Sequence, residues 1–201
     1  MSLRFQYNKT SLQALNKQLL IRERALPTLK NKESALRMEV KAAKQKTEAI
    51  AASLEKLIKE REKDLKMWNE FDDSLIEVEE VKVIYKKIAG VKTPELDDVI
   101  FNIKDYNLFL RPKWFPEGID IIEELMKLVI KKELSVKKME MLEYARKKTT
   151  QKVNLYEKVQ IPEYHGAIRK IKRFLEDEEN LTKAAQKIVK TRQQKTAEAQ
   201  L

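Results

Sequence analysis

The sequence predicts a mainly α-helical protein, in which a long antiparallel two-helix coiled coil holds a small β-hairpin insert between its helices. Charged residues make up 37% of the 201 residues and there are only three glycines, a composition typical of long exposed helices. Apolar residues recur with a helical period near both ends of the chain, and the strand-like segment lies between them. We therefore expect one elongated domain with helices over 1–76 and 117–201 and an insert over 77–116, a rod with both chain ends at one tip.

The first helix is predicted from a heptad frame that continues from about residue 9 to residue 75. Polar residues interrupt this frame at Arg22, Glu33, Thr47, Arg61 and Asp64. A single frame sustained this long is typical of a coiled-coil seam, and an isolated helix of this kind would fray without a partner helix. The apolar a and d positions are Leu12, Leu15, Leu19, Leu26, Leu29, Leu36, Val40, Ala43, Ile50, Leu54, Leu57, Trp68, Phe71 and Leu75.

The insert begins where the helical period stops. Residues 79–88 alternate and are rich in β-branched side chains, which predicts a half-buried strand that ends near Thr93 and Pro94. A second strand is expected over 98–103, followed by a loop over 107–116 that contains two prolines. A two-stranded hairpin is only marginally stable alone, so we expect it to pack on the helices or on a partner.

Aromatic residues concentrate in this insert. The rings either pad the hairpin against its own helices or contact a partner protein, and the sequence leaves both possibilities open. For partner contact we take Val83 together with five of the rings, leaving out Phe109. The six aromatic residues are Tyr85, Phe101, Tyr106, Phe109, Trp114 and Phe115.

The second helix has a less regular apolar stripe. The stripe runs through Ile121, Leu125, Leu128, Met139, Leu142, Val153 and Tyr156, and restarts as Ile168, Ile171, Leu175, Ala185 and Val189. Pairing the helices about the insert places Pro27 level with His165, close to Pro162 and Gly166. Because proline and glycine disturb helices, we predict a shared bend or joint at Pro27, Pro162 and Gly166, with coincidence as the alternative.

Positive charge is concentrated toward the two ends of the chain. Residues 1–48 hold 11 basic and 4 acidic side chains, residues 166–201 hold 9 and 5, and the remainder holds 22 and 23. A rod with both ends at one tip would therefore have a basic tip, with Arg4, Lys9 and Arg192 as candidate partner contacts. Its partner would be a nucleic acid, a membrane surface or an acidic protein cavity.

Several function classes lack the residues that they require. The chain has no cysteine and a single histidine, so no thiolate site, histidine-pair metal site or histidine-based triad is expected. No phosphate-binding glycine loop is present, and we predict no catalytic, cofactor-binding or metal-ligating residue. No apolar run suffices to cross a bilayer and no signal peptide is apparent, so we expect a cytoplasmic protein without membrane insertion. The basic runs lack interleaved aromatics, which disfavours nucleic acid.

Three motifs carry a family resemblance. The run from Lys152 to Pro162, KVNLYEKVQIP, resembles a signature of the D subunit of the V-type ATPase and archaeal-type (A-type) ATP synthase family. Residues 29–36, LKNKESAL, and residues 88–91, IAGV, are similar to that family's N-terminal helix and central hairpin. The resemblance covers nearly the whole chain and points to a bacterial member.

This resemblance implies a non-catalytic central rotor shaft, or central stalk. In the family, the coiled coil enters the bore of a hexamer of catalytic A and regulatory B subunits, the small stalk F subunit binds its side, and its lower end rests on the subunit that caps the membrane rotor ring. Rotation couples ATP hydrolysis or synthesis to ion transport, on the cytoplasmic side of the inner membrane and peripheral to it. The alternative from the residues alone is a basic coiled-coil nucleic-acid-binding or scaffold protein.

Overall fold

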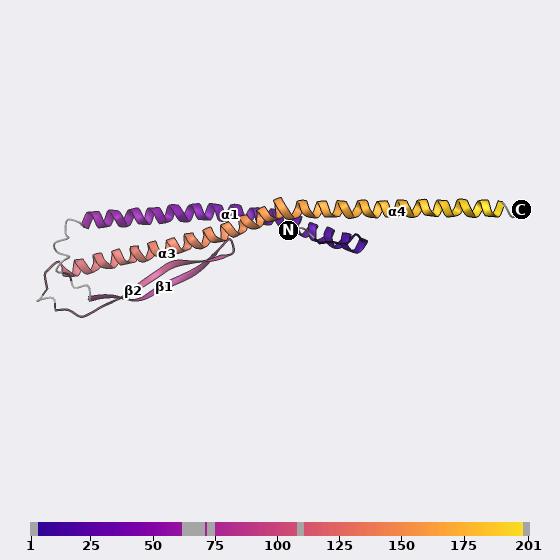
Figure 1. The fold of residues 1–201 in the computed structure, drawn as a ribbon. Coiled ribbons are helices and arrows are strands. Elements are labelled where there is room, and N and C mark those ends of the chain that lie inside the picture. The colour runs from indigo at the N-terminus through magenta and orange to yellow at the C-terminus, as the bar shows by residue number, and fades with distance from the viewer. Residues whose placement is uncertain (1–3, 62–70, 72–74, 108–110, 199–201) are drawn as a thin grey trace. The chain divides into compact units, whose positions relative to one another are not determined.

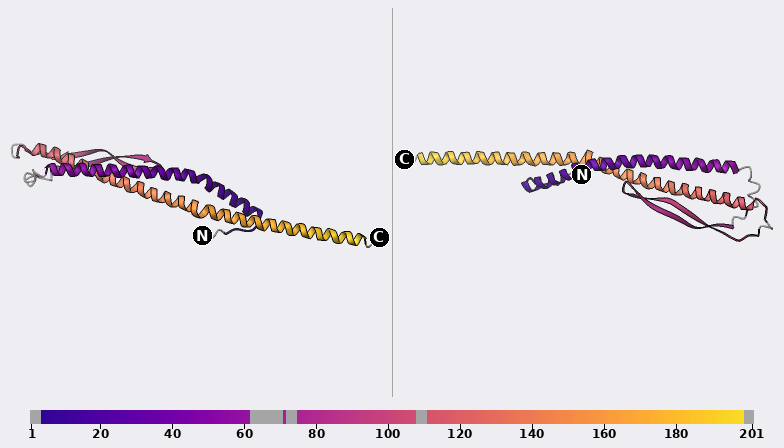
Figure 2. Two further views of the ribbon diagram at one scale, coloured as in Figure 1. Left: turned by 90° about the horizontal axis from the view of Figure 1, so that it is seen from above. Right: turned by 180° about the vertical axis from the view of Figure 1, so that it is seen from behind.

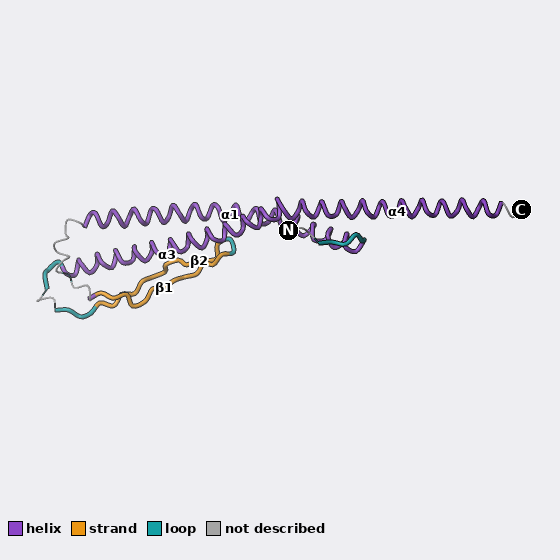
Figure 3. The backbone as a smooth tube through the Cα atoms, viewed as in Figure 1, coloured by secondary structure: helices purple, strands orange, loops and turns teal. Residues whose placement is uncertain are grey.

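The computed structural model describes residues 4–61, 71, 75–107 and 111–198 (Figure 1). The chain divides into two compact units, which are described separately below: unit 1 is Met1–Asn31 with Thr150–Leu201, and unit 2 is Lys32–Thr149. The architecture is mainly helical with a two-stranded antiparallel hairpin, as predicted (Figure 3). The elements are α1 (Lys9–Arg61), β1 (Ile76–Ile88), β2 (Val91–Ile103), α3 (Phe115–Asn154), a π-helical turn η3 (Leu155–Gln160) and α4 (Ile161–Glu198).

The heptad frame of α1 is confirmed along the described helix. Every a and d position from Leu12 to Leu57 is buried or half-buried, including the polar interruptions. The extension of the frame to Leu75 is wrong, because Phe71 is not helical and Leu75 directly precedes β1. Both side chains pack into an aromatic cluster around Phe115 instead of continuing the seam. Trp68 lies outside the described residues.

The core of unit 2 joins the seam of α1 and α3 to the tip of the hairpin. Leu36 of α1 and Leu142 of α3 are fully buried and share a cluster with Ala43. Ile88 and Val91, which flank the hairpin turn, pack against this cluster. The tip of the hairpin therefore lies on the helix pair, as the instability of a free hairpin requires.

The hairpin closes through a two-residue turn, with Ile88 paired to Val91. Ala89 and Gly90 have φ values of 47° and 83°, the left-handed pair that defines a type I′ turn. The strand over 79–88 is confirmed and begins three residues earlier than predicted, at Ile76. Its expected half-burial is wrong, because every side chain from residue 79 to residue 87 except that of Val83 is exposed. The second strand begins at Val91, so the expected break at Thr93 and Pro94 is wrong. Pro94 is tolerated because each strand of a two-stranded sheet is an edge strand.

Unit 1 is an antiparallel pairing of the start of α1 with α4. Leu15 and Leu19 pack with Tyr164, Ile168 and Ile171, and Ile171 is fully buried. The two chain segments run side by side in the three views of Figures 1 and 2.

The register of this pairing differs from the prediction. Lys30 Nζ lies 2.6 Å from Glu157 Oε1, and His165 Nε2 lies 3.2 Å from Glu23 Oε1. Antiparallel pairing therefore places Pro27 level with residues 160–161, about one helical turn from His165. The prediction was wrong because it assumed a first helix that continued to Leu75.

The π-helical turn explains why the apolar stripe restarts. In η3 the N–H of Ile161 donates to the carbonyl oxygen of Tyr156, five residues earlier. One extra residue in a turn rotates everything that follows by about 100°. If the seam continued past Tyr156 and Gln160 with the ordinary spacing of three and four residues, Lys170 would be buried. Instead Lys170 is exposed and the next residue, Ile171, is buried.

α4 continues beyond the part of α1 that covers it. All side chains from Glu176 to Lys195 are exposed, so the prediction that Ala185 and Val189 lie in the intramolecular seam is wrong. The reason is length: Lys9 at the start of α1 lies near Glu179, and the chain supplies no described helix opposite the residues that follow.

Candidate partner-binding surfaces

The aromatic side chains of the insert form a cluster at the base of the hairpin. Phe115 is fully buried, with its ring 4.9 Å from Phe71, 5.3 Å from Trp114 and 5.8 Å from Tyr106. Phe101, Tyr106 and Trp114 pack against the cluster of buried residues to which Phe115 belongs, and they are half-buried. In the chain taken alone, the rings of Phe101, Tyr106, Trp114 and Phe115 pack the hairpin and its loop against the start of α3. Phe109 lies outside the described residues.

β1 presents the apolar surface that remains open to a partner. Tyr85 is 68% exposed and Ile84 is 46% exposed, whereas Val83 is half-buried. Val78 and Val81 are also exposed and were missed by sequence reasoning. The alternation in the sequence did not identify them, because β1 is exposed on both faces except at Ile76, Val83 and Ile88. Of the predicted insert residues, Tyr85 presents the largest open surface.

A carboxylate fastens the hairpin to α1. Glu95 of β2 lies 2.7 Å from the ammonium of Lys86 on β1 and 3.5 Å from that of Lys46 on α1. The hydrogen bond from Lys86 lowers the pKa of Glu95, against the opposing effect of partial burial, and Lys138 adds a further lowering charge. Glu95 lines a groove of about 520 Å³ formed by α1, α3 and the hairpin.

We expect Glu95→Gln to remove an acid-sensitive part of the stability of unit 2. A carboxyl whose pKa is lowered in the folded state stabilises the fold above its unfolded pKa and loses that effect as pH falls through the folded pKa. The advantage of the natural protein over the variant should be complete at pH 7 and should fade below the ordinary carboxyl value of 4.5. Urea unfolding of both proteins from pH 7 to pH 3 measures this difference. Glu48→Gln, at an exposed pair, is the control, and an equal pH dependence for both variants would contradict the assignment.

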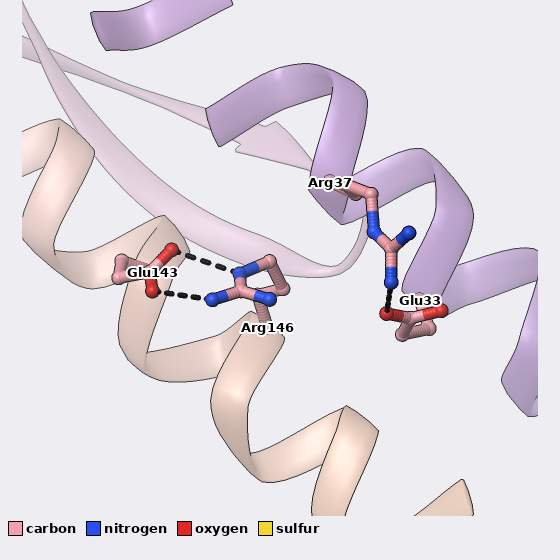
Figure 4. Close-up of polar contacts among 4 residues, drawn as sticks. All are labelled: Glu33, Arg37, Glu143 and Arg146. Atoms are coloured by element: carbon pink, nitrogen blue, oxygen red, sulfur yellow. Dashed lines mark hydrogen bonds and ion pairs between the residues drawn. The ribbon is translucent and has the colours of Figure 1, made fainter. Parts of the chain in front are cut away.

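A polar layer interrupts the seam of unit 2. Glu33, an a position of α1, is only 14% exposed at its side chain and accepts a 2.8 Å bond from Arg37 (Figure 4). Across from it on α3, Arg146 donates two bonds, of 2.9 Å and 2.6 Å, to Glu143. These bonds raise the pKa of Arg146, and the Glu33 carboxylate raises it further. Glu33, a predicted interruption of the first helix, thus lies near a guanidinium of opposite charge on α3.

A second polar contact lies in unit 1, at the π-helical turn. The Nε of Arg22 donates a 2.7 Å bond to the side chain of Gln160. Its guanidinium lies 4.6 Å from the ring centroid of Tyr164 and 5.9 Å from that of Tyr156, within the range of cation–π attraction. Arg22 therefore contacts two side chains within the irregular turn and one in α4, which follows it.

The three residues of the suspected joint are all helical in the structure. Pro27 and Pro162 are exposed, and a Cβ added at Gly166 would meet no atom within 4 Å. Pro162 is the second residue after the π-helical turn, at the start of α4, where a helix tolerates a residue without a backbone N–H. Pro27 is level with the same turn. A joint at this level stays a prediction.

Nearly all of the net charge belongs to unit 1. Its ranges hold 17 basic and 8 acidic side chains, a net charge of +9, whereas unit 2 holds 25 and 24. The predicted contacts Arg4, Lys9 and Arg192 are exposed. Unit 1 therefore offers a broadly basic surface, and unit 2 is almost neutral.

The three sequence motifs are linked through residues 29–36 of α1. Lys30 in the first motif is the ion-pair partner of Glu157 in the run that ends at Pro162. Leu36, in the same first motif, lies in the cluster against which Ile88, Ala89 and Val91 of the hairpin motif pack. The motifs that carry the resemblance therefore contain residues that contact one another, in unit 1 and in unit 2.

Two other kinds of site are absent from the described residues. Within these ranges, no group of three or more histidine, cysteine, aspartate or glutamate side chains is placed to hold a metal ion. None of the helices in the part of the chain that the structure covers is long and apolar enough to cross a membrane.

These features define a class of protein: an antiparallel two-helix coiled coil with a β-hairpin insert, a polar layer in its seam and one strongly basic unit. The model of the family described as the D subunit of ATP synthase matches residues 11–191, and the chain belongs to that family. It is similar to the V-type ATP synthase D subunit of Borreliella burgdorferi, with 28% identity over 189 residues that cover 91% of this chain and 92% of the relative. The protein of the same name from Chlamydia pneumoniae is 29% identical over 183 residues, which cover 88% and 87% of the two chains.

Proposed function

We propose that the chain is the non-catalytic central rotor shaft of a V/A-type rotary ATPase. It would transmit torque between ATP hydrolysis or synthesis in a catalytic hexamer and ion translocation in a membrane ring. The observation that carries this proposal is the seam of α1, buried or half-buried at every a and d position from Leu12 to Leu57. A shaft must resist twisting, and a long interdigitated seam supplies this resistance because interdigitated side chains resist sliding.

The partners follow from this role. The basic unit 1 would lie in the bore formed by the A and B subunits, the F subunit would bind beside the hairpin, and unit 2 would approach the subunit that caps the membrane ring. The chain would thus be peripheral to the inner membrane on its cytoplasmic side, with catalysis confined to its partners.

Copurification tests the proposal directly. The chain, tagged and co-expressed with the A, B and F subunits of a bacterial V-type ATPase, is expected to elute with them in a fixed stoichiometry and to raise rotary ATP turnover. An ATPase that assembles and turns over without incorporating this chain would refute the shaft assignment.

We further propose that unit 1 makes a diffuse electrostatic contact with acidic bore walls. A spread of charge stabilises several rotary positions about equally, whereas a deep specific contact would trap one of them. Replacing Arg4, Lys9 and Arg192 by Gln should lower assembly or turnover and weaken the salt dependence. A matched control replaces Lys44, Lys56 and Lys131 of unit 2 by Gln. Equal losses from both sets at low ionic strength would count against the contact.

The hairpin is proposed to share in binding the F subunit. Tyr85→Ala removes its most exposed aromatic ring and should weaken this binding, and deletion of residues 81–106 should weaken it more. Titration of labelled F subunit measures both effects. Full affinity after the deletion would exclude the hairpin from this interface.

The charge of unit 1 also favours a second candidate, a coiled-coil nucleic-acid binder. Such a protein would bind duplex DNA with an affinity that falls steeply as salt rises, because counterions are released from phosphates. Fluorescence anisotropy with a labelled duplex across a series of salt concentrations distinguishes the candidates. We expect weak binding that does not compete with assembly into the ATPase.

The joint hypothesis is tested at Gly166. Because a Cβ meets nothing within 4 Å there, Gly166→Ala should stabilise unit 1 by about 1 kcal/mol through helix propensity alone. If the level of Pro27 and Pro162 bends during rotation, the same variant should slow turnover while raising stability. Thermal unfolding and ATP turnover of the assembled complex give the two readings. Unchanged turnover in a stabilised protein would argue against a role for Gly166 in a joint.

A further inference from the structure

The C-terminal part of α4 is an amphipathic helix whose apolar side chains face solvent. From Glu176 to Lys195 every side chain is exposed, and Leu181 is 72%, Ile188 55% and Val189 54% exposed. α1 begins at Lys9, which lies near Glu179, so within the described ranges no helix covers the residues that follow. Exposed apolar side chains in such a row are the usual mark of an interface.

The exposed residues have the spacing of a coiled-coil seam. Leu181, Ala185 and Ile188 follow one another at intervals of four and three residues, and so lie on one face of the helix. Continuing the same spacing adds Glu178 before them and Arg192 and Lys195 after them. This face has apolar residues in the middle and opposite charges at its two ends.

Charge along this segment is separated in sequence. Residues 176–179 are four consecutive acidic side chains, and residues 180–195 hold five basic side chains and no acidic one. Two such helices side by side in parallel would oppose like charges at both ends. In an antiparallel pair, the acidic block of each helix faces the basic end of the other, and the apolar residues meet at the centre.

We propose that in the free protein this segment binds the same segment of a second copy, as an antiparallel helix pair. The charge pattern selects the partner, because a sequence that is acidic at one end and basic at the other is complementary to itself only when reversed. In this antiparallel pair, Glu178 lies opposite Lys195 of the second copy, and Ala185 lies opposite Ile188 of the second copy. The apolar face of α4, which would contact other subunits in the ATPase, is covered in this pair by the second copy while the chain is free.

Charge reversal tests the pairing. Sedimentation equilibrium of the full chain at low salt should show a dimer whose fraction grows with concentration. Asp177→Lys with Glu178→Lys, or Arg192→Glu with Lys195→Glu, should each weaken the dimer by about tenfold or more. The chain that carries all four reversals restores the complementarity and should dimerise like the natural protein. These positions leave the 2.7 Å Glu179–Lys183 pair intact, and circular dichroism checks that helix content is unchanged.

Single cysteines test the direction of the pair, because the natural chain has none. Ala185→Cys lies near the centre of the antiparallel pair, so a short bismaleimide should join two copies efficiently. Lys195→Cys would lie roughly 25 Å from its counterpart, about 17 residues along the helix, and should not be joined. A chain that stays monomeric at every concentration, a dimer indifferent to both reversals, or equal cross-linking at both positions would each overturn the proposal.

Discussion

Replacing Leu36 by Ala is expected to lower the free energy of unfolding of unit 2 by about 2–5 kcal/mol. Leu36 is fully buried in the cluster that joins α1, α3 and the tip of the hairpin. The truncation would leave a cavity that Leu142, Ala43 and the hairpin side chains cannot all move to fill. The hairpin would therefore loosen together with the helix seam.

Urea unfolding monitored by circular dichroism measures this loss. Met38, two residues along the same helix and 70% exposed, supplies the control, and Met38→Ala should change stability by less than about 0.5 kcal/mol. Because Leu36 and Leu142 share one cluster, the double variant should cost less than the sum of the single variants. Equal effects of Leu36→Ala and Met38→Ala would contradict the buried seam.

Replacing Phe115 by Ala is expected to cost about 3–5 kcal/mol. The ring is fully buried and contacts three other aromatic rings, so the change removes both its buried area and the aromatic pairings. The base of the hairpin, around Leu75 and Ile76, should lose its packing at the same time.

Trp114 reports on this site, because its ring lies 5.3 Å from Phe115. In a Trp68→Phe background it is the one remaining tryptophan, and its emission should shift to the red in Phe115→Ala before any denaturant is added. Tyr85→Ala is the matched control: it should leave stability and emission unchanged while weakening partner binding. An unshifted spectrum in Phe115→Ala would show that the cluster does not exclude water.

The heptad frame allowed the buried face of α1 to be predicted residue by residue. It assigned Leu36, Ala43 and Leu54 to the seam, and the polar positions Arg22 and Glu33 as well. The pattern does not show how polar positions are satisfied, because their partners come from the other helix. Arg22 meets Gln160 and two tyrosines, and Glu33 lies near Arg146, and neither grouping can be read from one helix alone.

The errors have a common physical origin in features that a local pattern does not encode. The hairpin was predicted too short because Pro94 usually ends a strand, but an edge strand tolerates it. The register was wrong by about a turn because the end of the first helix depends on where Phe71 and Leu75 pack. Ala185 and Val189 were placed in the seam because their spacing fits, although the opposing helix has already ended.

The π-helical turn over Leu155–Gln160 has a consequence for the evolution of this family. An extra residue in one turn is what a single-codon insertion into a regular helix leaves behind, provided that both flanking seams keep their contacts. A homologue that lacks one residue in this turn would hold the same buried face with an uninterrupted helix, as long as it also lacks Pro162. A related sequence that lacks the extra residue should therefore be aligned with a one-residue gap here. Without the gap, every residue from Tyr164 onward would be compared with one that faces a different way.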